Sequence, residues 1–398
     1  MKPSMLLKFL FFSLFIFISQ ITHAYVGLCC GKCGGNMPLN LMGGGVPETH
    51  EFRIKINTTA MHMEDLVDGD SSINGDAILD QNMGGMGGMG GIGMMAQTTG
   101  KFMAIPTEMD MNMLNVSAAY SFSDDFVAGI MLMYMDNSMD MIFSQQMAGK
   151  DGFTMESDGI GDTMLMAKYR LFTDDPLIPK SQGSLFMGLS LPTGSIDETN
   201  SNHPVAMRSE ELLPYGMQLG SGTVDPSVGF LYSGSQSPYW WGANAVYTAR
   251  LYDNDRDYRL GDKFNLDLYS MYQLNHSLVA ELQLNSSYQD EINGEMDESK
   301  TGESGHATMG DGNSPFTTPL WDPDNYGGTK VGTTLGLQWQ PVPLQIFNLQ
   351  VGIPLYQKLN GIQLEDDWRV SLTWYVELPT KKSRRYQQKG KSNSTLGF

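Results

Sequence analysis

Cysteine is scarce in this chain of 398 residues. Its three copies, Cys29, Cys30 and Cys33, all lie within the stretch LCCGKCGG. A disulfide framework spreads its cysteines along the chain, so this pattern excludes a disulfide-stapled fold. The pair Cys30 and Cys33 has C-x-x-C spacing, which is compatible with a thiolate metal clip or a reversible disulfide. A local disulfide beside one spare thiol explains the pattern equally well.

Positive charge is also in short supply. The chain has 25 Lys and Arg against 44 Asp and Glu, a formal net charge of -19. Phosphate binding needs clustered Lys and Arg, so we expect no nucleic-acid partner. The sequence contains no G-x-S-x-G, H-E-x-x-H or P-loop motif, and no base stands beside a nucleophile. We therefore expect no enzymatic activity and no catalytic residue.

Long apolar runs are missing beyond the first residues. The opening MKPSMLLKFLFFSLFIFISQITHA has basic Lys2 and Lys8, an apolar run from Phe9 to Ile18, and a small-x-small ending at Ala24. This pattern predicts a secretory signal peptide over 1–24, cleaved near Ala24. Loss of its two lysines would take the charge from -19 to about -21. No later apolar run reaches eighteen residues, so no membrane helix is predicted.

Strict alternation of apolar and polar residues is what the chain has in abundance. Between 368 and 378, even-numbered positions are apolar from Trp368 to Leu378, while Arg369, Ser371 and Glu377 share the other parity. Such a period of two predicts β-strands. About twelve segments show it, near 51–60, 111–122, 126–135, 161–172, 183–191, 223–232, 239–251, 262–274, 277–288, 328–339, 344–353 and 368–378.

The connections between these segments alternate between short and long. Short turns are expected near 123–125, 233–238, 275–276 and 340–343, and loops near 61–110, 136–160, 192–222, 252–261, 289–327 and 354–367. This rhythm predicts an all-β fold, an antiparallel transmembrane β-barrel of about 12 strands over 51–378. A secreted β-sandwich would also alternate. Aromatic residues near strand ends, at Trp368, Trp374 and Tyr239–Trp241, favour the barrel.

The flanking segments differ in composition from the barrel. Residues 25–50 are rich in Cys and Gly, and 379–398 form a basic polar tail. The loop near 61–110 contains the low-complexity repeat NMGGMGGMGGIGMM, for which no fixed structure is expected. The barrel would lie in the outer membrane of a Gram-negative cell, with long loops outside and both termini in the periplasm. Its expected partners are outer-membrane lipid, lipopolysaccharide and the barrel-assembly machinery.

Methionine recurs at every second residue in MDMNMLNVSAAYSFSDDFVAGIMLMYM, which begins at Met109. In a barrel one parity faces lipid and the other faces the lumen. The tight turn at 123–125 makes the two halves an antiparallel pair, so their methionine-rich ends should lie side by side. The inward set is Met109, Met111, Met113, Met131, Met133 and Met135, joined by Met164, Met166, Lys168 and Arg170. Asp225 is expected in the lumen or at its rim.

Three interpretations of the methionines remain open. Thioethers select Cu(I) or Ag(I) over hard cations, and Met61, His62, Met63 and the three cysteines would add soft ligands. Methionine also forms pliable linings for hydrophobic substrates. Finally, the side chains could simply fill the barrel. No cofactor is required, and Cu(I) is the one candidate.

Five stretches of the chain occur in a familiar order. They are GIGDTMLMAKYRLF (Gly159–Phe172), GLSLPTGS (Gly188–Ser195), LGSGTVDPSVGFLYS (Leu219–Ser233), YRLGDKFNLDL (Tyr258–Leu268) and VGIPLYQKLNGIQLEDDWRVSLTWYVEL (Val351–Leu378). This series resembles the family of outer-membrane transporters named for the meta pathway of phenol degradation, in a methionine-rich form. The resemblance implies an outer-membrane barrel that passes hydrophobic or aromatic compounds. It assigns no ligand residues.

The sequence therefore predicts an outer-membrane transporter or channel. Its solute would be a hydrophobic or aromatic compound or a soft metal ion, passing through a partly methionine-lined lumen. The alternative is a cell-surface protein that sequesters Cu(I) or Ag(I) without transport.

Overall fold

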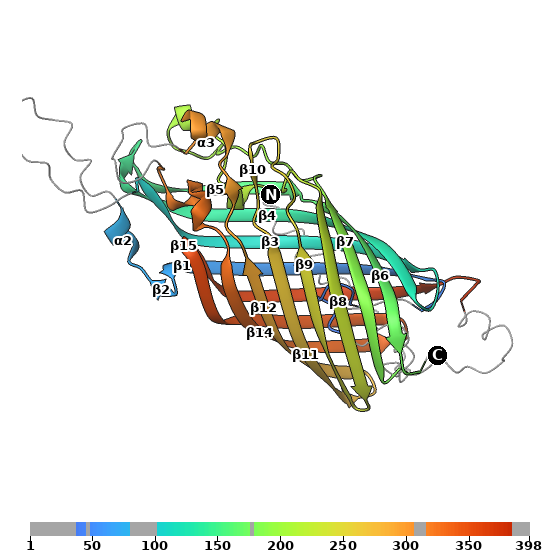
Figure 1. Cartoon of the computed structure of the whole chain (residues 1–398). Coiled ribbons are helices and arrows are strands. Elements are labelled where there is room, and N and C mark those ends of the chain that lie inside the picture. Colours follow the sequence, from blue (N-terminus) through green and yellow to red (C-terminus); the bar gives the residue numbers. More distant parts are fainter. Residues whose placement is uncertain (1–36, 45–47, 80–101, 176–178, 306–315, 384–398) are drawn as a thin grey trace, which may run out of the picture.

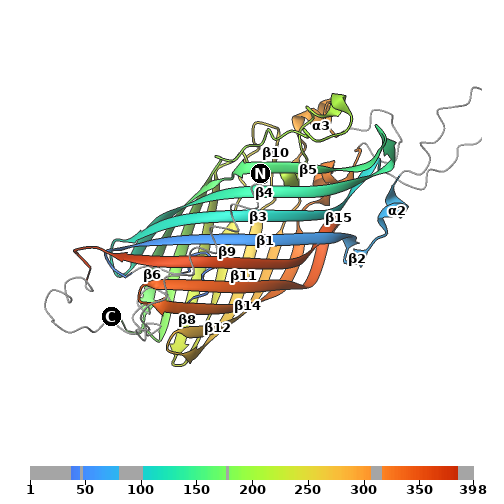
Figure 2. The same ribbon diagram turned by 180° about the vertical axis from the view of Figure 1, so that it is seen from behind.

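The alternating segments form one closed antiparallel barrel in the computed structural model (Figures 1 and 2), which describes residues 37–44, 48–79, 102–175, 179–305 and 316–383. The prediction of an all-β barrel with about 12 strands is confirmed. The wall consists of β1 (Glu51–Gly69), β3 (Ala104–Ser121), β4 (Phe126–Met147), β5 (Lys150–Ile160), β6 (Thr163–Thr173), β7 (Ser181–Leu191), β8 (Asp225–Gln236), β9 (Tyr239–Thr248), β11 (Lys263–Asn275), β12 (Leu278–Gln289), β14 (Gly328–Val342) and β15 (Gln345–Pro379).

The sheet closes between the two ends of the chain. Neighbours in the wall are neighbours in sequence, and β15 pairs with both β14 and β1. Leu359 is in register with Gly328 of β14 and with Gly69 of β1, whereas Gln345 and Pro379 lie at the opposite end of the barrel. The 35-residue β15 therefore crosses the wall twice. Strand β5 continues β6 along the side of β4, so the chain makes twelve passes.

The strands differ in length around the ring. Strands β1, β3 and β4 have 19, 18 and 22 residues, whereas β9 has 10. The long strands project beyond the rest of the wall (Figure 1). The expected loops at 61–110, 136–160 and 354–367 are consequently shorter than predicted, because strand structure continues through much of them. Their outward residues change from apolar to acidic, as at Asp136 and Asp158, so the alternation of hydrophobicity fades while the strands continue.

The outer face of the wall carries the expected apolar belt. Most of the predicted lipid-facing residues of β3, β4 and β6 are exposed and the others are half-buried, and exposed apolar residues continue around the ring. The belt includes Leu114, Leu132, Leu165, Phe230, Trp241, Leu268, Leu284, Leu337, Val351 and Trp374. Alternating apolar residues on the outside of a closed sheet are typical of a membrane barrel. Among the described residues, no helix is long and apolar enough to cross a bilayer.

Residues 37–44 lie inside the barrel. Met37, Leu39 and Leu41 are buried, and Met37 and Leu41 pack with Phe186, Leu231, Trp240 and Tyr269 of the wall. Polar contacts hold the backbone of this segment. Lys55 Nζ donates to the Leu39 carbonyl oxygen at 2.9 Å, and the Asn40 and Gln283 amides exchange hydrogen bonds at 3.1 Å. Residues 37–44 thus fill part of the lumen.

Connections at the end of the barrel away from Glu51 and Pro379 fold into a cap. The cap contains η4 (Ala206–Arg208), η5 (Tyr215–Met217), β10 (Tyr258–Arg259), β13 (Asn293–Gly294), α3 (Asp297–Thr301), η6 (Pro319–Trp321) and η7 (Pro323–Asn325). Two further short elements, β2 (Ser71–Ser72) and α2 (Gly75–Ile78), follow β1. Leu212, Tyr215, Tyr258, Met296 and Trp321 belong to a buried cluster of the cap. Met217, Leu320 and Tyr326 of the cap also line the cavity of the lumen.

Candidate transport lumen

One wall of the lumen is lined by methionine. Met63 pairs with Met109, Met109 with Met139 and Met139 with Met155, which gives an in-register row across β1, β3, β4 and β5. A second cross-strand pair is Met61 with Met111, and a third is Met113 with Met135. We call this surface the methionine wall. The prediction that the methionine-rich ends of 111–122 and 126–135 lie side by side is confirmed.

The other inward methionines lie nearer the termini. Met131 is in register with Met164, and Met166 lies opposite Gly129. These three line a small cavity of about 180 Å³ beside residues 39–43. Met133 lies opposite Asn115 on the same inward parity. The predicted set therefore shares one face of the sheet, but Met109, Met111 and Met113 line the large cavity, whereas Met131, Met164 and Met166 line the small one.

His62 lies on the other side of the wall from its neighbours. Met61 and Met63 line the lumen, whereas the His62 ring stacks on the outward-facing Trp368 with ring centroids 5.8 Å apart. Successive side chains of a strand point to opposite faces. Met61 and Met63 therefore face the lumen, whereas His62 faces the outer side of the wall. Cys29, Cys30 and Cys33, the predicted signal peptide and the repeat Asn82–Met95 lie outside the described residues.

The remaining lining of the lumen is polar and carries most of its charge; it begins on β15, where Arg369 and Asp366 are in register with Met61 and Met63 of β1. Lys263, Lys330 and Arg369 line the same cavity as the methionine wall, together with Asp267 and Asp366. Lys330 Nζ lies 2.7 Å from Asp366 Oδ1, and Asp267 Oδ1 accepts a hydrogen bond from Asn285 at 2.7 Å. Within the described parts of the chain, the side chain of Lys263 has no hydrogen bond or ion pair. We call these five residues the charged wall.

Below the charged wall, Glu281 is buried among amide side chains. Its carboxylate accepts hydrogen bonds from Gln350 Nε2 at 2.8 Å, from Asn348 Nδ2 at 3.1 Å and from Gln338 Nε2. The absence of a side chain at Gly336 makes space for the Glu281 carboxylate, since a Cβ there would clash with Glu281 Oε2. Gln350 also donates to Asn40 Oδ1 at 2.8 Å, which connects the network to residues 37–44.

The predicted inward polar residues are all buried, but they contact different parts of the chain. Lys168 Nζ lies 3.4 Å from the Gly43 carbonyl oxygen. Arg170 forms an ion pair with Asp125 at the turn near the termini, with Nη2 2.6 Å from Oδ1. Asp225 accepts a hydrogen bond from Thr223 at 2.7 Å and forms an ion pair with Arg250. In this structure each of the three residues makes polar contacts with another segment of the chain.

The two walls enclose a cavity of about 730 Å³. This size is in the range of small-molecule sites. Residues 40–42 line it on the side of the termini, and Met217 and Tyr326 of the cap line it on the other. The chamber can therefore hold a small solute with an apolar body against thioethers and a polar group against Lys263 or Arg369.

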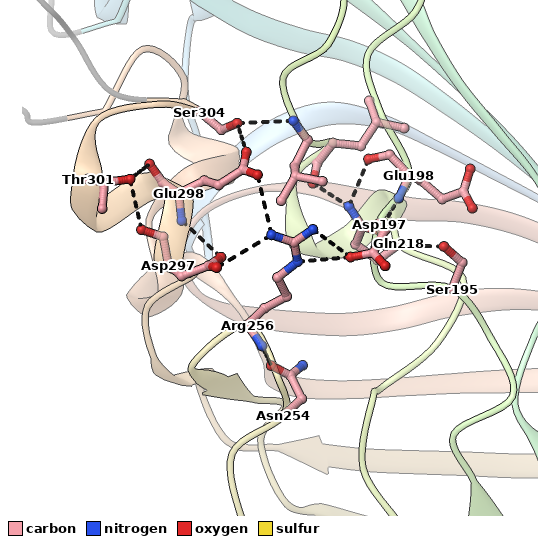
Figure 3. Close-up of polar contacts among 12 residues, drawn as sticks. Ser195, Asp197, Glu198, Gln218, Asn254, Arg256, Asp297, Glu298, Thr301 and Ser304 are labelled. Atoms are coloured by element: carbon pink, nitrogen blue, oxygen red, sulfur yellow. Dashed lines mark hydrogen bonds and ion pairs between the residues drawn. The ribbon is translucent and has the colours of Figure 1, made fainter.

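Arg256 joins three connections of the cap (Figure 3). Its Nη2 lies 2.6 Å from Asp197 Oδ1, and its Nη1 lies 3.4 Å from Asp297 Oδ2 and 3.3 Å from Glu298 Oε1. Partial burial disfavours its charge, but the hydrogen bond and charge of Asp197 outweigh this and raise the pKa of Arg256. In the cluster beneath it, burial raises the pKa of Tyr258 to about 12. Arg256 therefore links three connections of the cap through ion pairs.

Sequence reasoning found the methionine wall but missed the charged wall and the cap. Lys263, Lys330 and Arg369 stand at inward parity in segments recognised as strands, and this parity was the signal that could have identified them. Arg256 gave no such signal, because its partners come from connections 41 to 59 residues away.

Comparisons with known proteins add likeness of fold. No family model matches the sequence, and no curated protein matches it. Among solved structures, an outer membrane channel from Pseudomonas putida F1 has a TM-score of 0.52 at 11% identity, over 86% of this chain and 99% of that one. The P. putida toluene transporter TodX has a TM-score of 0.40 at 10% identity, over 83% of this chain and 91% of that one. The transport unit of the Escherichia coli autotransporter AIDA-I has a TM-score of 0.40 at 10% identity, over 88% of this chain and 99% of that one.

Proposed function

We propose that this protein is an outer-membrane channel that passes small solutes with a hydrophobic or aromatic body. The observation that carries the proposal is the chamber between the methionine wall and the charged wall. Thioether side chains adapt their shape to different apolar ligands. The polar groups of the same cavity would orient the solute and favour one with an anionic or hydrogen-bonding end. The apolar belt and the shared fold with the P. putida F1 outer membrane channel support the location.

Flux into liposomes tests this proposal. The purified barrel is reconstituted, and entry of an aromatic solute such as benzyl alcohol or benzoate is compared with that into protein-free vesicles. We expect faster entry with the protein, and slower entry after Met111→Trp, which fills the chamber. Leu132→Trp on the outer face is the matched control and should leave the flux unchanged. Equal flux with and without protein, also after deletion of residues 37–44, would contradict the proposal.

A second candidate function is handling of Cu(I) or Ag(I). The observation in its favour is the row of Met63, Met109, Met139 and Met155, since several thioethers in register supply soft ligands. Ag(I) titration followed by methionine methyl NMR tests it. Met109→Leu with Met139→Leu should abolish the shifts, while Met131→Leu with Met133→Leu should not. The reverse pattern, or no shift, would leave the methionines as an apolar lining.

Transport and sequestration of the metal can be separated in cells. A strain without the protein would change metal uptake or efflux if the barrel conducts. It would change only tolerance and surface-bound metal if the barrel sequesters.

A further inference from the structure

The closing seam of the barrel, between β1 and β15, has an irregular register near the end away from the termini. His62 is in register with Trp368, but the next residue of β1, Met63, is in register with Asp366. Asp367 is therefore the extra residue of a β-bulge. Bulges re-aim side chains and often occur beside functional sites. Here Asp366 faces the chamber, where it pairs with Lys330, and Asp367 is exposed.

The bulge brings Asp367 to two residues of β1. One ligand atom each of His62, Glu64 and Asp367 lie within 4.8 Å of one another. His62 Nε2 is 3.6 Å from Glu64 Oε2. The three residues come from opposite ends of the sequence, so only closure of the barrel makes the cluster.

The imidazole ring of His62 is oriented by two neighbours. Its Nδ1 lies 2.7 Å from Asp110 Oδ1 of β3, and its face stacks on Trp368 with an interplanar angle of 20°. A carboxylate that accepts the Nδ1 proton fixes the tautomer with the lone pair on Nε2, an arrangement common in metal sites. Nε2 is the nitrogen directed at Glu64.

We propose that His62, Glu64 and Asp367 bind one divalent transition-metal ion of the Zn²⁺ class on the outer surface of the barrel, with Asp110 as a positioning residue. One imidazole and two carboxylates form a borderline ligand set that suits Zn²⁺ rather than Cu(I). The thioethers of Met61 and Met63 face the opposite side of the sheet. The site is independent of the proposed transport function.

Such an ion would stabilise the pairing of β1 with β15 at the closing seam. Its ligands come from the first and last passes of the chain, and these ligands converge only when the strands pair. A ligand that binds the folded state alone stabilises it by mass action. Bound metal should therefore raise the temperature at which the barrel unfolds, and chelation should lower it.

Titration of the detergent-folded full-length protein with Co²⁺, used as a visible probe for Zn²⁺, tests the proposal. We expect one ion per chain, with d–d absorption that Zn²⁺ abolishes. His62→Gln and Asp367→Asn should each remove this binding. Asp110→Asn should keep the one-to-one stoichiometry but weaken affinity by about 10- to 100-fold, as expected for an outer-shell partner. Asp136→Asn is the matched control, because Asp136 is an exposed outward carboxylate on β4.

Cu²⁺ gives a local readout through the fluorescence of Trp368. Wild-type protein should show quenching at one equivalent, and Trp368→Phe should lose that component. Asp367 is exposed on a bulge, so Asp367→Asn should fold even if His62→Gln does not. Binding of several ions that Asp136→Asn weakens as much as Asp367→Asn, or Co²⁺ binding unchanged in Asp367→Asn, would overturn the site and leave only a diffuse acidic surface.

Discussion

The methionine wall and the charged wall belong to the same sheet and differ in almost everything else. One is built from β1, β3, β4 and β5, and its inward residues are thioethers that reach a buried apolar cluster under the cap with Leu213 and Met217. The other is built from β11, β14 and β15 and carries Lys263, Lys330 and Arg369. Both have the same outer belt. The barrel fold thus fixes which side chains face inward, and the chemistry of the lumen depends on the residues placed there.

Reversing the net charge of the charged wall should have the largest effect on the difference between the two walls. The formal charge of its five residues is +1, and Lys263→Glu with Arg369→Glu makes it −3. Attraction of anions should become attraction of cations, because charges in a narrow lumen act on permeating ions at short range. We expect the ratio of benzoate to benzylamine flux in liposomes to reverse. Lys358→Glu with Lys381→Glu, both exposed, is the control. An unchanged ratio would exclude the charged wall as a selectivity element.

Removal of the Glu281 carboxylate should clearly lower the stability of the barrel. Glu281→Leu leaves three amide donors without their acceptor, and we expect a loss of about 2 to 4 kcal/mol in the free energy of unfolding. Urea unfolding in lipid vesicles measures it. Glu291→Gln, at an exposed position, should change stability little. A loss as small as that of the control would mean that the network does not support the wall.

Loss of the Arg256 ion pairs should make the cap less stable and leave the barrel intact. Arg256→Gln removes the charge that three carboxylates share, which should cost about 1 to 2 kcal/mol of local stability for partly exposed pairs. Proteolysis between 192 and 224 should accelerate, and aromatic flux should rise. Arg208→Gln is the control, since its pair with Glu211 lies within one loop. Identical cleavage rates in the two variants would show that Arg256 does not hold the cap closed.

Exchange of thioether for hydrocarbon should have the smallest effect on stability for each residue changed. Met63, Met109, Met139 and Met155 replaced together by leucine keep volume and hydrophobicity, so each change should cost less than about 1.5 kcal/mol. Met139→Ala alone should cost about 2 to 5 kcal/mol, because it opens a cavity. Urea titration compares the two. A larger loss per residue in the leucine variant would show that sulfur itself contributes to packing of the methionine wall.

The sequence predicted where the strands of the wall lie better than where each strand ends. The period of two located all twelve passes, and the parity of Met109 and Met131 placed them inward. The ends of β1, β3 and β4 were misplaced because their outward residues become acidic above the belt, as at Asp110 and Asp136. Alternation of hydrophobicity then disappears although the backbone pairing continues. The cap and residues 37–44 have no such period and could not be predicted.

What the sequence determined by itself is local: which segments are strands and which residues share a face, since side-chain direction follows from strand geometry alone. Only the tertiary structure decided which faces meet. Asn40 pairs with Gln283, 243 residues away, and His62 approaches Asp367 across the closing seam. Both contacts depend on ring closure and strand register, and the seam contact also depends on a bulge of one residue. These features arise from pairing between distant segments, which no local pattern encodes.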